Sequence, residues 1–332
     1  MRVLVTGGSG YVGSHVAKML DQNGHIPFVL DKVADHRTWC NPHIRHFTGD
    51  IADHVGLNKL FQTYKFDAVI HLAASSEVGP SVTNPLMYYA NNVSNSALLI
   101  SICLQNGVNK FIFSSTSAVY GQVPIKMLPT RERYEKNPET SYGASKLCVE
   151  YMLRDVSVAH GMRSVALRYF NASGAAPDAT IGEYRENPTH LIPSLAAVAL
   201  GKRDTFTFNG IDYPTQDGTP VRDYAHVWDI ADAHVKALEY LNNGGETIAL
   251  NIGSGDCKSV QEMYEEFSKQ WGEHIPFVVG EKRPGDIAMN FADIKLAKET
   301  LGWTPTRSTA KLIIEDAIRW YRTNLYKNLT HV

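Results

Sequence analysis

Tyr142 and Lys146 are the two residues whose types and spacing most clearly suggest chemistry. They lie in an amphipathic helix expected over Ser141–His160, where a separation of four residues places both side chains on one face. A tyrosine, whose usual pKa is about 10, is a poor base at neutral pH. A neighbouring ammonium group favours the phenolate and lowers that pKa, so the pair is suited to proton transfer.

A run of hydroxyl residues supplies the context that such a pair needs. The apolar strand Lys110–Phe113 continues into Ser114, Ser115 and Thr116. Open α/β sheets present ligand-binding side chains at the carboxyl ends of their strands. We therefore expect the Thr116 hydroxyl to hydrogen-bond the reacting oxygen. Without this context, a tyrosine and a lysine four residues apart would more simply decorate a helix surface.

A glycine loop follows the first expected strand, Arg2–Thr6, and precedes a helix expected over Tyr11–Asn23. The loop fits GxxGxxG on Gly7, Gly10 and Gly13, and it also fits GxGxxG starting from Gly8. Either register lets a pyrophosphate approach the helix N-terminus without meeting a Cβ atom. The alternative is a glycine-rich turn selected only for tight packing. Strand, loop and helix in this order favour a dinucleotide site.

Two acidic residues after later strands refine the expected cofactor. Asp31 stands 18 residues beyond Gly13, close to the spacing of about 20 at which an acid hydrogen-bonds the adenosine ribose. A carboxylate there repels a 2′-phosphate and favours NAD, although the neighbouring Lys32 could accommodate that phosphate. Asp50 follows the third strand, where it could accept from the adenine amino group or simply form a turn and cap a helix.

The elements that must position these residues alternate between short β-branched strands and amphipathic helices, which predicts a parallel, doubly wound α/β sheet. We expect a Rossmann-type domain at residues 1–171 plus about 219–243. A smaller substrate domain is expected at 172–218 plus about 244–332. Further strands are expected at Pro27–Leu30, Ile44–Thr48, Ala68–His71 and Arg163–Arg168, and helices at Asp53–Tyr64, Pro85–Asn106, Leu191–Leu200 and Ala310–Tyr326.

Composition excludes several classes of protein. The 332 residues carry a formal net charge of -2, so no basic surplus exists to neutralise a nucleic-acid backbone. The four cysteines stand singly, which argues against a disulfide scaffold and a zinc site. No apolar run approaches the roughly 20 residues of a membrane span, and no signal-peptide pattern opens the chain. We expect a cytoplasmic enzyme with no metal and no membrane or nucleic-acid partner.

The chain resembles the extended short-chain dehydrogenase/reductase family, and within it the branch that epimerises UDP-glucose and UDP-galactose. The resemblance covers almost the whole length. Besides the glycine loop, the hydroxyl run and the Tyr142–Lys146 pair, it rests on motifs at residues 71–74 (HLAA), 91–93 (NNV), 167–171 (LRYFN), 212–215 (DYPT), 221–227 (VRDYAHV) and 283–286 (RPGD).

This resemblance implies roles for individual residues. Tyr142 would be the catalytic acid and base, Lys146 its electrostatic partner and nicotinamide-ribose ligand, and Thr116 the hydroxyl that shares the 4-oxygen. The implied NAD contacts are Gly7, Gly10, Tyr11, Val12, Gly13, Asp31, Lys32, Asp50, Ile51, Leu72, Ala73, Ala74, Asn91, Ser114, Ser115, Tyr142, Lys146 and Tyr169. The implied UDP-sugar contacts are Thr116, Tyr142, Asn171, His190, Leu191, Asn209, Arg222, Tyr224, Arg283 and Asp286.

The implied reaction interconverts UDP-galactose and UDP-glucose through a 4-keto sugar. Dehydratases of this fold carry an Asp-Glu pair directly after the threonine, whereas this chain has Ser117 and Ala118. Epimerases of UDP-pentoses or UDP-uronates, decarboxylases and a non-catalytic NAD-binding scaffold remain as alternatives. Ser76 replaces a lysine found in some members, and Asn290 stands where others have a bulky tyrosine, which leaves room for N-acetyl sugars. A homodimer through the helices Pro85–Asn106 and Ser141–His160 is also implied.

Overall fold

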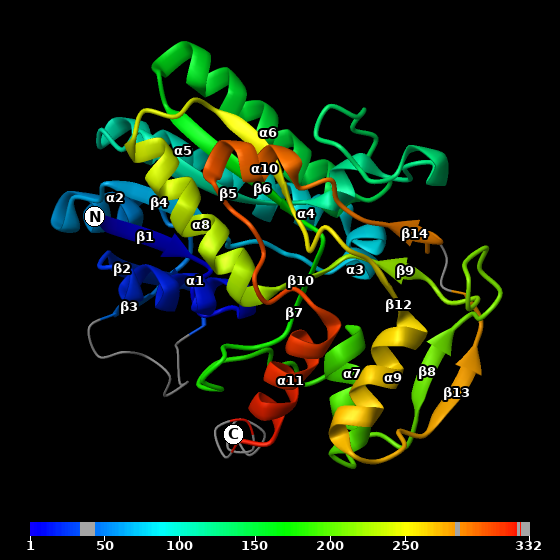
Figure 1. The fold of residues 1–332 in the computed structure, drawn as a ribbon. Helices are drawn as coiled ribbons and strands as arrows, with labels where there is room; N and C mark the ends of the chain where they lie inside the picture. Colours follow the sequence, from blue (N-terminus) through cyan, green and yellow to red (C-terminus); the bar gives the residue numbers. More distant parts are fainter. Residues whose placement is uncertain (34–43, 283–285, 324–325, 327–332) are drawn as a thin grey trace.

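The computed structural model describes residues 1–33, 44–282, 286–323 and 326, and it centres on a seven-stranded parallel sheet (Figure 1). The strand order is β11-β6-β5-β4-β1-β2-β3, so the chain changes direction across the sheet between β1 and β4. The strands are β1 (Arg2–Thr6), β2 (Ile26–Asp31), β3 (Arg45–Thr48), β4 (Ala68–His71), β5 (Lys110–Thr116), β6 (Arg163–Tyr169) and β11 (Ile248–Ile252).

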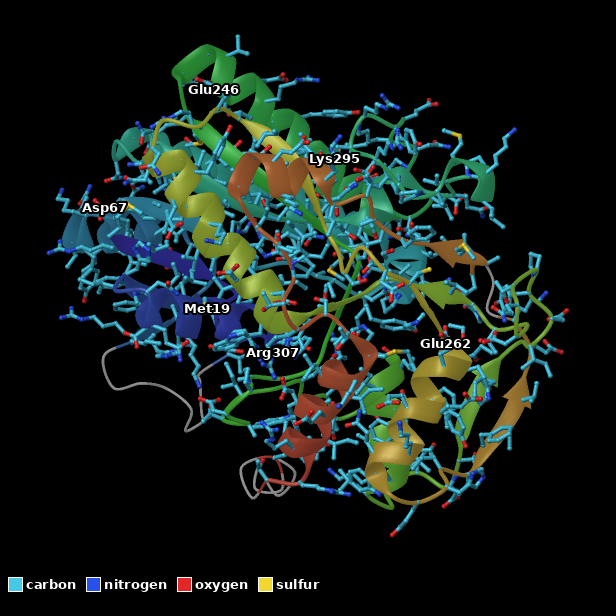
Figure 2. The ribbon with its side chains drawn as sticks, viewed as in Figure 1. Met19, Asp67, Glu246, Glu262, Lys295 and Arg307 are labelled. Atoms are coloured by element: carbon cyan, nitrogen blue, oxygen red, sulfur yellow. The ribbon has the colours of Figure 1, made fainter. Side chains whose placement is uncertain are left out.

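Helices cover both faces of this sheet because its central strands are apolar on both sides. On one face α1 (Tyr11–Gln22) and α8 (Val227–Asn242) enclose a core that includes Val3, Met19 and Leu238. Figure 2 labels Met19 on α1. On the other face lie α2 (His54–Tyr64), α5 (Asn95–Gln105) and α6 (Ser141–His160). The predicted doubly wound Rossmann-type fold is confirmed.

The helix predicted over Pro85–Asn106 is interrupted. The chain forms α4 (Pro85–Tyr89), a π-helical turn over Ala90–Ser94, and then α5, preceded by a short unpredicted helix α3 (Val78–Thr83). Within the π turn, Asn92 accepts from the Ser75 backbone N–H at 2.8 Å and donates to the Ser75 carbonyl at 3.0 Å. The wide turn therefore joins this helix to the segment that follows β4.

A second group of elements packs around its own core, which contains Ile192, Phe208, Phe267 and Trp320. Its helices are α7 (Leu191–Ala199), α9 (Val260–Trp271) and α11 (Ala310–Tyr321), which ends five residues before the prediction. Its strands β8 (Phe206–Asn209) and β13 (Phe277–Gly280) pair in parallel. Short elements join the two cores: β7 (Asn171–Ser173), β9 (Val221–Arg222), β10 (Tyr224–His226), β12 (Lys258–Ser259), β14 (Met289–Asn290) and α10 (Lys295–Leu301).

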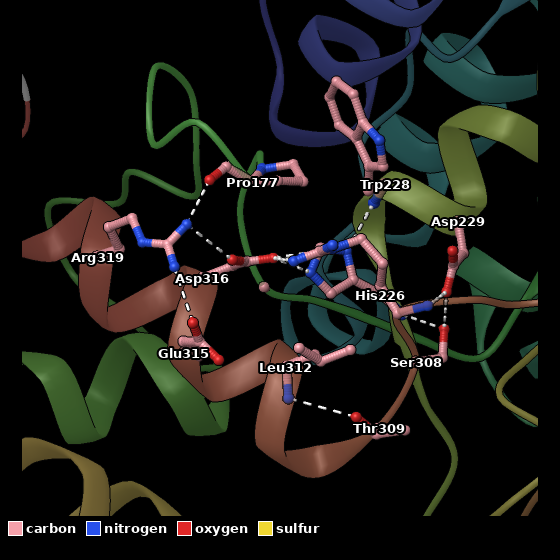
Figure 3. Close-up of polar contacts among 12 residues, drawn as sticks. Pro177, His226, Trp228, Asp229, Ser308, Thr309, Leu312, Glu315, Asp316 and Arg319 are labelled. Atoms are coloured by element: carbon pink, nitrogen blue, oxygen red, sulfur yellow. Dashed lines mark hydrogen bonds and ion pairs between the residues drawn. The ribbon is translucent and has the colours of Figure 1, made fainter.

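Buried polar contacts connect α8 of the first core to α11 of the second (Figure 3). His226 accepts from the Trp228 backbone N–H through Nδ1, so its Nε2 carries the proton and donates to Asp316 at 3.1 Å. The Ser308 hydroxyl donates to Asp229 at 2.6 Å. Because His226 and Asp316 are fully buried, this arrangement fixes the two cores relative to each other.

Among the described residues, no helix is both long and apolar enough to cross a membrane.

Candidate active site

A cavity of about 1920 Å³ opens at the carboxyl ends of the central strands and extends to the second core. This volume exceeds the roughly 300–1,000 Å³ of a pocket for one small ligand, so it suits a dinucleotide together with a nucleotide sugar. All but two of the residues implied by the resemblance line it. They are Gly7, Gly10, Tyr11, Val12, Gly13, Asp31, Lys32, Ile51, Leu72, Ala73, Ala74, Asn91, Ser114, Ser115, Thr116, Tyr142, Lys146, Tyr169, Asn171, His190, Leu191, Asn209, Arg222, Tyr224 and Asp286.

The two exceptions are Asp50 and Arg283. Asp50 is absent from the cavity wall, because its carboxylate accepts from the Ala52 backbone N–H at 2.9 Å and pairs with Lys32 at 3.0 Å. Its contacts match the alternative interpretation of this residue as part of a turn. Arg283 lies outside the described residues.

The glycine loop forms a cradle of bare backbone at the N-terminus of α1. A Cβ atom added to Gly13 would lie 2.1 Å from the Gly7 carbonyl oxygen, and one added to Gly7 would lie 2.6 Å from the Ala73 nitrogen. Gly10 is the N-cap of α1 and makes no side-chain hydrogen bond to it. The first N–H groups of this helix are therefore not capped by a side chain and can bind an anion in the cavity. This geometry fits the pyrophosphate of a dinucleotide.

Asp31 lies at the end of β2 beside that loop. Its two carboxylate oxygens accept from the backbone N–H groups of Ser9 at 3.0 Å and Val33 at 3.2 Å. These bonds fix the carboxylate at the cavity wall while leaving further lone pairs for ribose hydroxyls. The residues present therefore fit NAD as the cofactor.

Tyr142, Lys146 and Thr116 come together on the opposite wall. Lys146 is only 3% exposed, and its Nζ donates to the Ser114 carbonyl at 2.8 Å and lies 5.9 Å from the centroid of the Tyr142 ring. The Thr116 side chain lies close enough to the Tyr142 phenol to lower its pKa. The helical spacing has thus placed the tyrosine beside the hydroxyl that the strand presents.

The expected lowering of the Tyr142 pKa is not found in the protein itself. Burial raises the pKa of Tyr142 and outweighs the hydrogen bond from Thr116, which lowers it. Burial also lowers the pKa of Lys146 to about 7, so its ammonium form is itself disfavoured. The prediction was wrong on this point because it counted the lysine charge and omitted the desolvation of both groups.

Polar groups on the short joining elements, and His190 at the start of α7, line the far end of the cavity. Arg222 donates to Asp286 at 2.8 Å, and the Asn171 side chain donates to the Asp223 carbonyl at 2.8 Å. His190 is hydrogen-bonded at 2.8 Å to the buried carboxylate of Glu183. An arginine beside an aspartate offers a fork of donors for a diphosphate and an acceptor for hydroxyl groups.

Sequence reasoning missed an acidic and basic cluster on this wall. Glu183 also accepts from Arg185 at 2.7 Å, and Arg185 pairs at 3.3 Å with Glu77 on the segment after β4. Although burial opposes it, the hydrogen bond from His190 and the charge of Arg185 hold the pKa of Glu183 below its usual value. No local pattern could have found the contact with Glu77, because Arg185 and Glu77 are 108 residues apart.

Comparison with known proteins decides the family. Residues 3–253 match the model of the NAD dependent epimerase/dehydratase family. The chain belongs to this family. It is 41% identical over 325 residues to a UDP-glucose 4-epimerase of Lacticaseibacillus casei, with 98% of each chain covered.

Solved structures agree with this assignment. The chain is similar to a UDP-glucose 4-epimerase of Stenotrophomonas maltophila with bound NAD and formylated UDP-arabinopyranose, at 38% identity and a TM-score of 0.93 over 97% of this chain and 98% of that one. It is also similar to the Brucella ovis UDP-glucose 4-epimerase in complex with NAD, at 40% identity and a TM-score of 0.92 over 96% and 98%. The predictions of an epimerase and of NAD as its cofactor are confirmed.

Within the part of the chain that the structure describes, no group of three or more His, Cys, Asp or Glu residues could hold a metal ion.

Proposed function

We propose that this chain interconverts UDP-galactose and UDP-glucose at C4 through a 4-keto sugar. One observation carries the proposal: a single cavity is lined by the glycine loop and Asp31, by Tyr142 beside Thr116, and by the Arg222 and Asp286 pair. A cofactor, a reacting sugar and a diphosphate can thus be held together. The relatives named above, which carry this activity in their names, support the substrate assignment.

The catalytic roles follow from the contacts around Tyr142. Tyr142 takes the proton of the sugar 4-hydroxyl and returns it, and Thr116 donates to or accepts from the same oxygen. Lys146 is fixed by the Ser114 carbonyl and has its remaining N–H groups available for the nicotinamide ribose. Bound NAD would supply the acceptor for the C4 hydride and its donor to the opposite face of the 4-keto sugar.

The UDP-sugar contacts leave the sugar free to turn over. Arg222 and Asp286 bind the diphosphate and ribose, and Arg283, which lies outside the described residues, belongs to the same proposed set. Binding energy is thus concentrated on the nucleotide, which does not react. The remaining proposed UDP-sugar contacts are Asn171, His190, Leu191, Asn209 and Tyr224.

We extend the proposal to UDP-GlcNAc and UDP-GalNAc. Asn290 accepts from the Thr130 hydroxyl at 3.3 Å and is absent from the cavity wall, so no bulky side chain at this position fills the sugar end. A relative of 39% identity and TM-score 0.82 is described as the UDP-Glc/GlcNAc 4-epimerase of Campylobacter jejuni. Failure of the pure enzyme to convert either N-acetyl sugar, while it converts UDP-galactose, would refute this extension.

The proposal includes a homodimer in the cytoplasm. Exposed apolar side chains on α3, α4 and α6 support a helix-to-helix contact, among them Val82, Leu86 and Val158, which is 87% exposed. Light scattering after size exclusion should give twice the chain mass, and Leu86→Lys should shift it towards the monomer. An unchanged monomer mass for the wild type would contradict the dimer.

The domain division also remains a proposal, supported by the two separate cores. One boundary moves, because β11 lies within the stretch expected to belong to the substrate domain and yet pairs with β6 in the main sheet. We place the Rossmann domain at residues 1–171 plus about 219–252. Trp303 packs in the same core, so the segment around α10 covers this domain as well.

The decisive test of the reaction is purified protein incubated with UDP-galactose and no added nucleotide. Formation of UDP-glucose, followed by chromatography, supports the proposal if Tyr142→Phe abolishes it. If UDP-galactose remains unchanged even with added NAD, the substrate assignment fails. UDP-pentoses and UDP-uronates should then be tried.

A further inference from the structure

Glu150 extends the face of α6 that carries the proposed catalytic pair. Three residues at four-residue intervals on this helix each contact the end of β5. The contacts run from Tyr142 to the Thr116 hydroxyl, from Lys146 to the Ser114 carbonyl at 2.8 Å, and from Glu150 to the Ser115 hydroxyl at 2.5 Å. Helix α6 thus contacts three successive residues of β5, Ser114 to Thr116.

Glu150 is itself held by a buried ion pair with Arg168 on β6. Arg168 donates to one carboxylate oxygen at 2.9 Å and to the other at 2.5 Å, and the two side chains are 5% and 8% exposed. Arg168 also donates to the Tyr120 hydroxyl at 2.7 Å, which donates to Asn251 at 2.7 Å. A bidentate pair allows little rotation, so the carboxylate is a rigid anchor.

Ser115 is the link between this anchor and the hydroxyl run. The family resemblance implied a contact between Ser115 and NAD, but its hydroxyl donates to Glu150 and the residue is 1% exposed. We propose that Glu150 and Arg168, through Ser115, are positioning residues that fix the register of α6 against β5 and thereby place Tyr142 and Lys146 beside Thr116. This inference rests on the proposed function.

The Ser115 link is expected to affect the catalytic step and not the binding of the nucleotide. Loss of the Ser115 link lets α6 slide relative to β5, which displaces the phenol from the reacting oxygen. A displacement of about 1 Å at a reacting group is enough to lower a rate about 100-fold. Arg222 and Asp286, the proposed diphosphate and ribose contacts, lie outside both elements and keep their positions. The expected change is therefore in kcat and not in KM.

The experiment compares Ser115→Ala with Ser308→Ala in the full-length protein, with bound NAD quantified in each preparation. Ser308 likewise donates to a buried carboxylate, that of Asp229 (Figure 3), and it does not line the cavity. We expect Ser115→Ala to lower kcat for UDP-galactose between about tenfold and about 100-fold, with KM within about twofold of the wild type. Ser308→Ala should lower the melting temperature about as much as Ser115→Ala does, but it should leave kcat unchanged.

Arg168→Lys provides a second variant, because it retains the charge but loses the bidentate geometry. Like Ser115→Ala, it should lower kcat. The inference is overturned if the wild type is active and Ser115→Ala loses thermal stability but keeps the wild-type kcat. It is also overturned if Ser115→Ala raises KM and keeps kcat. Wild-type protein that does not convert UDP-galactose instead overturns the proposed function.

Discussion

Lys146 Nζ donates its hydrogen bond to the Ser114 carbonyl oxygen, 2.8 Å away, and not to the phenol of Tyr142. It lies 5.9 Å from the centroid of the tyrosine ring. The Thr116 side chain lowers the pKa of this phenol, although burial outweighs the effect. We therefore expect proton transfer at Tyr142 to depend on the Thr116 hydroxyl at the end of β5.

Replacing Tyr142 with Phe should remove the acid and base while preserving the shape of the wall. We expect kcat for UDP-galactose to fall between about 100-fold and about 10,000-fold, the usual contribution of a positioned general acid or base. KM should change little because the nucleotide contacts remain. Tyr151→Phe, on an exposed part of the same helix, is the control and should keep full activity. A Tyr142→Phe enzyme with more than a tenth of the wild-type rate would contradict the assigned role.

Replacing Asp31 with Asn should weaken NAD binding. The substitution removes the charge from an acceptor expected to bind ribose hydroxyls, a difference of about 1.5–3 kcal/mol or roughly tenfold to 100-fold in Kd. Asp67→Asn is a matched control, because Asp67 also accepts from a backbone N–H, that of Arg2 at 2.6 Å, but precedes β4 at the amino ends of the strands, away from the cavity. Calorimetric titration with NAD that gives equal Kd values for both variants would refute the prediction.

Replacing Gly13 with Ala should disrupt the glycine loop. The added Cβ would lie 2.1 Å from the Gly7 carbonyl oxygen and 2.7 Å from the Gly8 Cα, both backbone atoms that cannot move away alone. We expect a lower melting temperature and the loss of the stabilisation that added NAD gives the wild type. Gly79→Ala, whose Cβ meets open space, should keep the wild-type melting temperature. Equal NAD stabilisation of Gly13→Ala and wild type would show that the loop tolerates the change.

The protein should lose stability as the pH falls from 6.5 towards 5. Burial lowers the pKa of His15 and His71 to about 3 and that of His234 to about 4, so the folded state stays neutral where the unfolded chain binds protons. Asp223 opposes this effect, because burial raises its pKa to about 6 and the folded state binds a proton first. These four groups together give a net uptake of about two protons on unfolding, which corresponds to a loss of about 3 kcal/mol per pH unit near pH 5.

Urea titrations at pH 7, 6 and 5 measure this dependence directly. His234→Gln should reduce the slope by about one proton, or about 1.4 kcal/mol per pH unit. An unfolding free energy that is flat between pH 7 and 5 would mean that these histidines are protonated in the folded state.

The sequence by itself determined the features that depend on local spacing. The strand, glycine loop and helix order placed Gly7 and Gly13, the helical period placed Tyr142 four residues before Lys146, and the end of β5 placed Thr116. These features could be predicted because each depends on a few neighbouring residues and a fixed backbone period. The parallel sheet followed from the alternation of strands and helices.

Only the tertiary structure decided which distant side chains meet. It turned the Ser115 hydroxyl towards Glu150 and Arg168, paired Asp50 with Lys32, and joined Arg185 to Glu77. It also raised the pKa of Tyr142, because the desolvation that opposes its ionisation comes from several packed elements together. Such contacts depend on how elements pack in three dimensions, which the spacing of residues along one strand or helix does not specify.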